Sequence, residues 1–250
     1  MTVTLGIVLN ETNAIRAKPD RRVGLVLLER TFYDPPRRAA MVRWTQQIRR
    51  SFPAATVVPY TWHLASHGPD DSTRQHATRT LAGEPGKIGS LQLNAETQPA
   101  WDVTEICREA CEAQQIVVRT PPSLTPGMLG RRRLQKVAEA QQAKGVSLIW
   151  EPSGLWEATE ALAFGREIGA KVIFPAFEGG RPSYVSEGSL DLVGFGAWLG
   201  VAPVGARQNL SGDQVDALVD HAEEHPDSVM IFSGRRALAG IRTVGEALEA

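Results

Sequence analysis

Three residues able to transfer protons stand at or just beyond the ends of short apolar runs in this 250-residue chain. Glu29 and Glu151 each end such a run, and His67 follows a third run within a few residues. Two carboxylates and an imidazole that face one cleft suffice for general acid–base catalysis. We therefore take Glu29, His67 and Glu151 as the candidate catalytic residues.

Aromatic and polar side chains near the same run ends could hold a ligand. An arginine can bind an anion through paired donors, and aromatic rings offer flat apolar surfaces with a polar edge. Packing explains large aromatic residues at such positions equally well. The candidate ligand-binding residues are Tyr33, Tyr60, Trp62, Arg119 and Trp156.

The spacing of His63 and His67 resembles a helical pair of metal ligands, with Asp70 and Asp71 behind it. The glutamate that zinc-protease motifs place beside the first histidine is missing. A divalent ion needs at least three protein ligands, so Glu29 or Glu151 would have to join the pair through the fold. We predict neither a metal site nor a cofactor, and leave metal-assisted hydrolysis as an alternative.

Eight short apolar runs, most of them separated by helix-like stretches, must position these residues. They are too short for buried helices and rich in β-branched residues, which is typical of strands in a parallel sheet. Eight such units in about 250 residues predict a TIM (β/α)8 barrel, with its site at the carboxyl ends of the strands. The runs are Val3 to Leu9, Val23 to Glu29, Ala55 to Tyr60, Gln115 to Arg119, Val146 to Glu151, Lys171 to Phe174, Leu190 to Phe195 and Ser228 to Phe232.

Between the runs, proline, serine and glycine signals predict most of the helices. The expected helices cover residues 36–52, 97–111, 125–144, 153–169, 211–225 and 235–248. The first connection, 10–22, and the sixth, 178–188, are polar or rich in Gly and Pro, so their helices are expected to be irregular. Residues 63–85 form the longest irregular stretch, and we extend this third connection through Lys87 to Leu93 rather than place a ninth strand there.

The composition limits the class of protein. A hydrophobic fraction of 42% and no linker-like segment predict one domain over residues 1–250. A formal net charge of −1 argues against a general affinity for nucleic acid or anionic membranes. Arginine clusters at 37–38, 49–50, 131–133 and 235–236 leave local nucleic-acid binding open, although solvated helix faces explain them more simply.

No stretch approaches the roughly 20 apolar residues that span a bilayer, and the first residues do not resemble a signal peptide. We therefore expect a cytoplasmic protein that does not enter a membrane. Cys107 and Cys111 lie four residues apart on one expected helix face, where two reduced buried thiols are the simplest interpretation.

Four segments taken in order resemble the YecE-like family, a group of TIM-barrel proteins known as domain of unknown function 72. The segments are ERTFYDPP at 29–36, WHLASH at 62–67, TPPS at 120–123 and WEPSGLW at 150–156. The resemblance covers about residues 25–235 and implies the barrel, a cytoplasmic location and a mouth at the strand ends. It implies no established reaction.

The chain departs from the family pattern at several polar positions. The resemblance implies a lysine where this chain has Tyr60, a glutamine where it has Arg119, and an arginine where it has Ser153. The family's aromatic, Arg and His on strand seven are replaced within residues 191–196. Cations are lost at two positions and one is gained at Arg119, which makes Arg119 a possible partner for Glu29 and Glu151.

These departures favour a divergent barrel with a weakly catalytic or non-catalytic mouth, acting by binding a small molecule or a protein. Charged groups in a water-excluded mouth persist only when they are paired or used. The alternative is a hydrolase or lyase that uses Glu29, His67 and Glu151, with or without a metal, on a phosphoester or nucleic-acid substrate.

Overall fold

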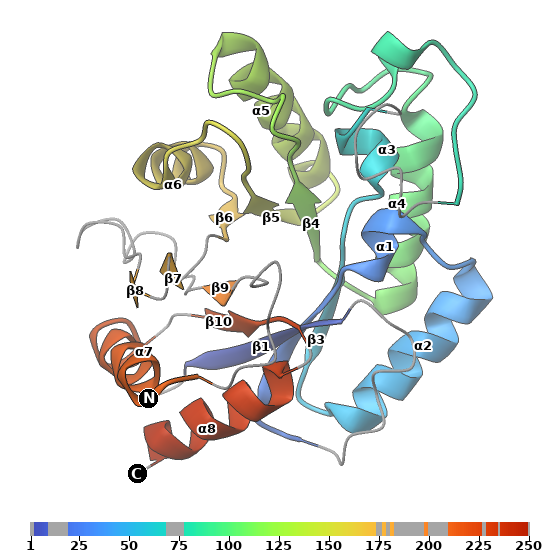
Figure 1. Cartoon of the computed structure of the whole chain (residues 1–250). Coiled ribbons are helices and arrows are strands. Elements are labelled where there is room, and N and C mark those ends of the chain that lie inside the picture. Colours follow the sequence, from blue (N-terminus) through green and yellow to red (C-terminus); the bar gives the residue numbers. More distant parts are fainter. Residues whose placement is uncertain are drawn as a thin grey trace.

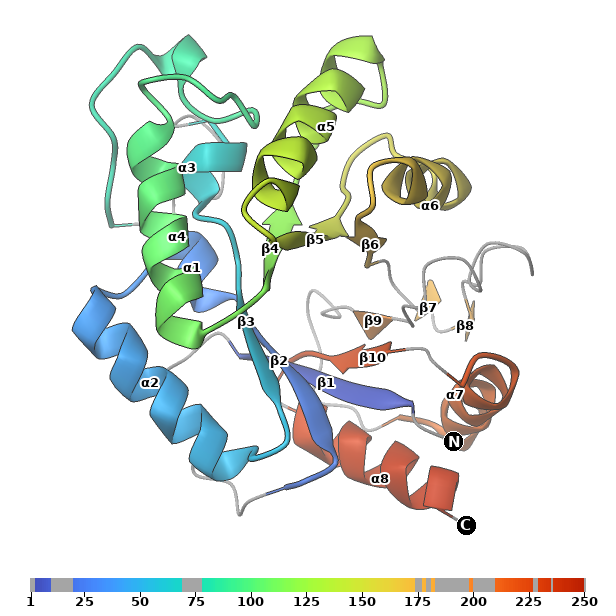
Figure 2. The same cartoon turned by 180° about the vertical axis from the view of Figure 1, so that it is seen from behind.

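The computed structural model describes residues 3–9, 20–68, 78–173, 177–178, 181–182, 198–199, 210–226, 229–234 and 236–249. Parallel strands occupy its centre, and helices surround them in both views (Figures 1 and 2). Among the described residues, no helix has the length and apolar character needed to cross a membrane.

The strands follow one another in the cyclic order of a TIM barrel. One sheet has the order β3-β2-β1-β10-β9 and a second has the order β4-β5-β6. A parallel bridge from Tyr60 to Val117 joins β3 to β4, so the chain order runs unbroken from β1 to β6. Because β1 also pairs with β10 near the end of the chain, the sheet curls back on itself. The bounds are β1 Thr4–Leu9, β2 Val23–Leu28, β3 Thr56–Pro59, β4 Gln115–Arg119, β5 Ser147–Glu151, β6 Lys171–Val172, β9 Trp198–Leu199 and β10 Val229–Phe232.

Six long helices cover the outside of the strands, and shorter ones lie in the connections. The long helices are α2 Arg38–Ser51, α4 Gln98–Cys111, α5 Met128–Gln142, α6 Ala158–Glu167, α7 Gly212–Glu224 and α8 Ala237–Glu249. The short ones are α1 Arg30–Tyr33, α3 His63–Ser66 and the 3-10 turn η2 Pro85–Lys87. Ser211 caps α7 in a capping box with Gln214, as its sequence predicts.

The barrel expected from the sequence is confirmed, with local differences. The predicted seventh run, Leu190 to Phe195, and most of the first connection lie outside the described residues. In the sixth connection, β7 Phe177–Glu178 pairs antiparallel with β8 Arg181–Pro182, where a helix was already doubtful. Residues 88–93 contain no strand, which confirms their place in the long third connection.

Two helix starts differ from the prediction. Helix α5 begins at Met128 after an extended Gly127, rather than at Thr125. Helix α6 begins at Ala158 rather than Ser153, because the preceding residues form a turn that packs on the neighbouring connection. In that turn Gly154 has a φ of 75° and lies against the backbone of Pro122, where a β-carbon would come within 2.7 Å of a carbonyl oxygen.

Alternation along the strands divides the core into two layers. On β2, Leu25 and Leu27 pack in one buried cluster with the ends of β3, β4 and β5. Val26 and Leu28 pack in the other cluster, against the apolar face of α2. The side-chain period of a strand is two, so the residue after Leu28 returns to the first cluster's side. That residue is Glu29.

Candidate functional site

Arg119 stands at the centre of a cluster at the carboxyl ends of three strands. Its Nη2 donates to Glu29 Oε1 at 2.8 Å, and its Nε donates to Glu151 Oε1 at 2.9 Å. The three side chains are 16%, 12% and 19% exposed, respectively. The guanidinium therefore joins two largely buried carboxylates, and the pairing that the sequence made possible is present.

Strand register explains why these side chains meet. Arg119 and Glu151 are register partners on the parallel strands β4 and β5, so their side chains leave the sheet on the same face. Glu29 directly follows β2 on the side of Leu25 and Leu27. Parallel strands end at the same edge of a barrel, and these residues therefore converge there.

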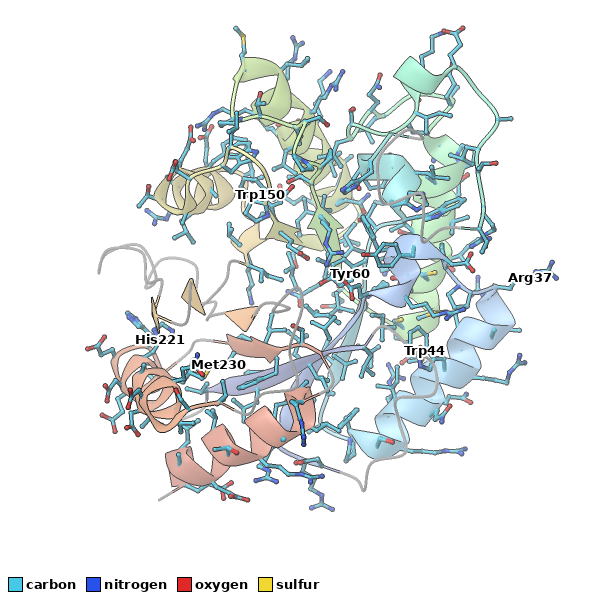
Figure 3. The ribbon with its side chains drawn as sticks, in the orientation of Figure 1. Arg37, Trp44, Tyr60, Trp150, His221 and Met230 are labelled. Carbon is cyan, nitrogen blue, oxygen red and sulfur yellow. The ribbon has the colours of Figure 1, made fainter. Side chains whose placement is uncertain are left out.

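An aromatic floor lies beneath the guanidinium. The Arg119 Cζ atom lies 4.9 Å from the ring centre of Phe32 and 5.0 Å from that of Tyr60. Both rings are fully buried, and Tyr60 lies in the middle of the barrel in Figure 3. Cation–π contacts of this kind contribute about 0.5–2 kcal/mol each when desolvated. Phe32 was not among the candidate residues, although its place in the segment 29–36 was the available signal.

Phe32 is positioned by the single helical turn α1 that follows β2. The Thr31 hydroxyl donates to the Leu28 carbonyl at 2.7 Å and accepts from the Tyr60 amide at 2.8 Å. This buried hydroxyl holds the start of the second connection against the end of β3. Thr31 is thus a positioning residue that the sequence analysis missed, since one buried threonine gives no distinctive pattern.

Two polar atoms of the cluster are buried without a hydrogen-bond partner among the described residues: the hydroxyl of Tyr60 and Oε2 of Glu151. Burial raises the pKa of Tyr60 well above its ordinary value, and the negative charge of Glu151 raises it further. The phenol therefore stays protonated at neutral pH. Unsatisfied buried groups of this kind are uncommon in folded proteins.

The charge of Arg119 is maintained by its partners. Burial by itself lowers the pKa of Arg119, but the carboxylates of Glu151 and Glu29 more than offset it, so the pKa lies well above its ordinary value. Burial also raises the pKa of Tyr33, whose phenol lies in the field of Arg119 and Glu29. The structure thus brings Tyr33, Tyr60 and Arg119 together with both candidate carboxylates.

His67 reaches this cluster through Phe32. Its ring is 3% exposed and meets the Phe32 ring edge to face, with the ring centres 4.9 Å apart. One ring nitrogen, Nδ1, lies 2.8 Å from the Ser66 hydroxyl. His63 is also buried, and its Nδ1 lies 3.1 Å from the Phe32 carbonyl oxygen. Both histidines therefore pack around the residue that supports Arg119.

The two remaining candidates lie in other surroundings. Trp62 is buried under the guanidinium of Arg79, which lies 4.9 Å from the Trp62 ring centre. Trp156 stacks on Phe164, and its indole donates to the Leu124 carbonyl at 2.8 Å. Figure 3 places the neighbouring Trp150 between β5 and α6. Trp62 and Trp156 are therefore packing residues in this structure.

Metal ligands do not gather in the part of the chain that the structure describes. No group of three or more His, Cys, Asp or Glu side chains is placed there to hold an ion. Asp70 and Asp71 lie outside the described residues. Cys107 and Cys111 are both buried and free, in keeping with the expected pair of reduced thiols.

Known proteins resemble this chain in structure rather than in sequence. No family model matches it, and no curated protein matches it. A DUF72 family protein from Enterococcus faecalis V583 is 11% identical with a TM-score of 0.60, over 100% of this chain and 96% of that chain. A DUF72 family protein from Thermotoga maritima MSB8 is 13% identical with a TM-score of 0.59, over the full length of both chains.

A xylose isomerase domain containing protein from Salmonella typhimurium LT2 is also 13% identical over the full length of both chains, with a TM-score of 0.57. At such low identity the likenesses demonstrate a shared fold. That fold is the TIM barrel, and two of the three proteins belong to DUF72, the family that the four sequence segments resemble.

Proposed function

We propose that this chain is a divergent YecE-like barrel whose mouth is weakly catalytic or non-catalytic and which acts by binding a small molecule or a protein. The observation that carries the proposal is the double ion pair of Arg119 with Glu29 and Glu151. Arg119 stands where the family resemblance implies a glutamine. The exchange ties both candidate carboxylates to a protein group.

The bonding of the cluster argues against efficient acid–base chemistry. A general base must reach the proton that it removes, at about 2.6–3.2 Å or through one water. Oε1 of each carboxylate already accepts from Arg119, and Oε2 of Glu151 is buried. The ring of His67 is buried against Phe32. A substrate would have to displace Arg119 before either carboxylate at its Oε1 atom could act.

The charge of the cluster favours a particular kind of small molecule. Two carboxylates and one guanidinium have a net charge of −1, so the arginine offers no uncompensated positive charge to a phosphate. A neutral ligand rich in hydroxyl groups, or a cationic one, suits this mouth better than a phosphoester or nucleic acid. Such a ligand could use the carboxylates as acceptors and the phenols as donors.

The arginine clusters also give little support to nucleic-acid binding. Arg38 pairs with Glu109 at 2.9 Å, Arg49 with Glu112 at 2.7 Å, and Arg131 with Glu160. These pairs spread both signs of charge over the helix faces. A phosphate backbone would have to compete with each acidic partner.

The hydrolase or lyase that uses Glu29, His67 and Glu151 stays the second candidate. In its favour, the cluster stands at the strand ends where TIM-barrel enzymes place their chemistry. The unpartnered atoms of Tyr60 and Glu151 also favour it, because such buried atoms gather at functional sites.

The test is a comparison of turnover and binding in the same preparations. Wild-type protein, Glu151→Gln and the matched control Glu105→Gln are assayed against phosphoesters, glycosides and esters. Glu105 suits as control because its ion pair with Arg108 is similarly half-buried but far from the cluster in sequence. Neutral polyols and amines are then screened by thermal shift and calorimetry.

We expect no turnover above background, and we expect any bound polyol or amine to lose affinity in Glu151→Gln but not in Glu105→Gln. Turnover that Glu151→Gln abolishes and Glu105→Gln retains would establish the enzyme instead. Adding and chelating divalent metals in that assay would then separate metal-assisted hydrolysis from unaided catalysis.

A further inference from the structure

Three large apolar side chains are exposed on two neighbouring connections at the carboxyl end of the barrel. Met128 is 86% exposed and Leu129 is 62% exposed, both in the first turn of α5, and Leu155 is 71% exposed in the turn before α6. Both views place the start of α5 beside the segment that leads into α6 (Figures 1 and 2). We call Met128, Leu129 and Leu155 the apolar rim.

The two connections that carry the apolar rim are fastened to each other. Ser153 Oγ donates to the Thr120 carbonyl, and the Trp156 indole donates to the Leu124 carbonyl at 2.8 Å. Gly154 approaches the Pro122 backbone closely enough to exclude a side chain. The rim is therefore a rigid surface, and little conformational entropy is lost when a partner covers it.

Charges of both signs flank the apolar rim. Arg132 is exposed on α5, one turn after Met128, and Glu157 is exposed at the start of α6, two residues after Leu155. Neither side chain forms an ion pair with any residue that the structure describes. By contrast, the adjacent Arg131 is held by Glu160 and by the Pro126 carbonyl.

We infer that the apolar rim is the centre of a twofold interface between two copies of this chain. A twofold axis brings the same patch of each copy together, so residue i of one copy meets residue j of the other and the reverse. The rims then cover each other, and Arg132 of each copy faces Glu157 of the other. A patch with apolar residues between opposite charges is complementary to itself in this arrangement.

The charges favour a second copy over a membrane. Juxtamembrane cations contribute only about 1 kcal/mol each at an anionic surface. Beside the rim, the exposed acidic Glu157 opposes that attraction and Arg131 is already neutralised by Glu160. In a dimer, Glu157 is an asset because it supplies the partner of Arg132. Apolar residues also make up a larger share of homodimer interfaces than of the general surface.

Sedimentation equilibrium of the full chain tests the inference. We expect a monomer–dimer equilibrium in the wild type, and a dissociation constant at least about tenfold higher in Leu155→Glu. Leu93→Glu is the matched control, because Leu93 is 48% exposed but lies in the third connection, away from the rim. Its dissociation constant should equal that of the wild type.

A charge exchange tests the twofold pairing itself. Arg132→Glu and Glu157→Arg should each weaken the dimer, because each puts like charges together at two symmetric positions. The double variant Arg132→Glu/Glu157→Arg should restore it, which simple loss of folding would not do. Circular dichroism of all variants checks that they are folded.

Several outcomes would overturn the inference. A wild type that stays monomeric up to about 1 mM excludes an interface of useful affinity. A dimer that Leu155→Glu leaves intact uses another surface. A monomer that cosediments with phosphatidylserine-containing vesicles assigns the rim to a membrane, and a monomer that does not leaves it to an unlike protein.

Discussion

Replacing Arg119 with methionine tests whether the double ion pair holds the barrel mouth together. Methionine has similar length and fills much of the space above Phe32 and Tyr60, but it removes the charge. Glu29 and Glu151 then face each other with no cation, at 12% and 19% exposure. Breaking a buried ion pair by removing one partner costs about 3–5 kcal/mol, because an uncompensated charge stays buried.

The expected loss is a large part of the total free energy of unfolding, which is about 5–15 kcal/mol for native proteins. Urea unfolding followed by tryptophan fluorescence measures it, since the chain has 6 tryptophans. With a slope near 3 kcal/mol per molar urea, the midpoint of Arg119→Met should fall by about 1 M or more. Partial burial of the pairs also predicts that added salt changes the wild-type midpoint little.

Neutralising the carboxylates supplies the control. Adding Glu29→Gln and Glu151→Gln to Arg119→Met removes both unpaired charges, so most of the lost stability should return. If Arg119→Met alone shifts the free energy of unfolding by less than about 1 kcal/mol, the guanidinium does not balance buried carboxylates. The proposal of a mouth closed by this ion pair would then be wrong.

Three further measurements follow from the structure. Burial, together with the nearby His225, lowers the pKa of His221 to about 4, below its ordinary value of 6.5. The unfolded chain therefore takes up the proton first as pH falls, so this stabilisation is complete above pH 6.5 and lost toward pH 4; between pH 7 and pH 5 wild type should lose about 2 kcal/mol more than His221→Gln in urea titrations. Burial raises the pKa of Cys107 to about 12 and that of Cys111 to about 11; thiol reagents at pH 8 should label them only after unfolding, and rapid native labelling would contradict their burial. Gly89 has a φ of 78° with a carbonyl oxygen 2.2 Å from the position of a β-carbon, so Gly89→Ala should lower the free energy of unfolding by about 2 kcal/mol or more, and an unchanged midpoint would contradict this local geometry.

The barrel could be predicted because its signals are local. The run Gln115 to Arg119 is β4 without any change of bounds, since Ile116, Val117 and Val118 are buried between polar ends. Glu29 and Glu151 could be placed at strand ends for the same reason. Whether they faced each other depended on register across β2, β4 and β5, and a shift of one residue would have turned either side chain away.

Other features depend on contacts between distant segments, which no local pattern reveals. Trp62 and Trp156 follow strands just as Tyr60 does, yet each packs in its own surroundings under a different arginine. Phe32 supports Arg119 because α1 turns the chain back over the mouth immediately after β2. From sequence alone, aromatic residues after a strand have equal claims to the floor of the site.

The departures from the family pattern make physical sense as one linked change. The resemblance implies lysine, glutamine and arginine where this chain has Tyr60, Arg119 and Ser153, so cations lost at two positions leave Glu29 and Glu151 in need of one. Arg119 supplies it and reaches both carboxylates through separate nitrogens. The ring of Tyr60 fills the space below the guanidinium, and its phenol stays neutral. A lysine at position 60 would instead place a second cation beside Arg119, at about 5 Å if its charge took the place of the ring. The exchanges at positions 60 and 119 therefore depend on each other, and together they turn a mouth that could receive an anion into one that is already occupied.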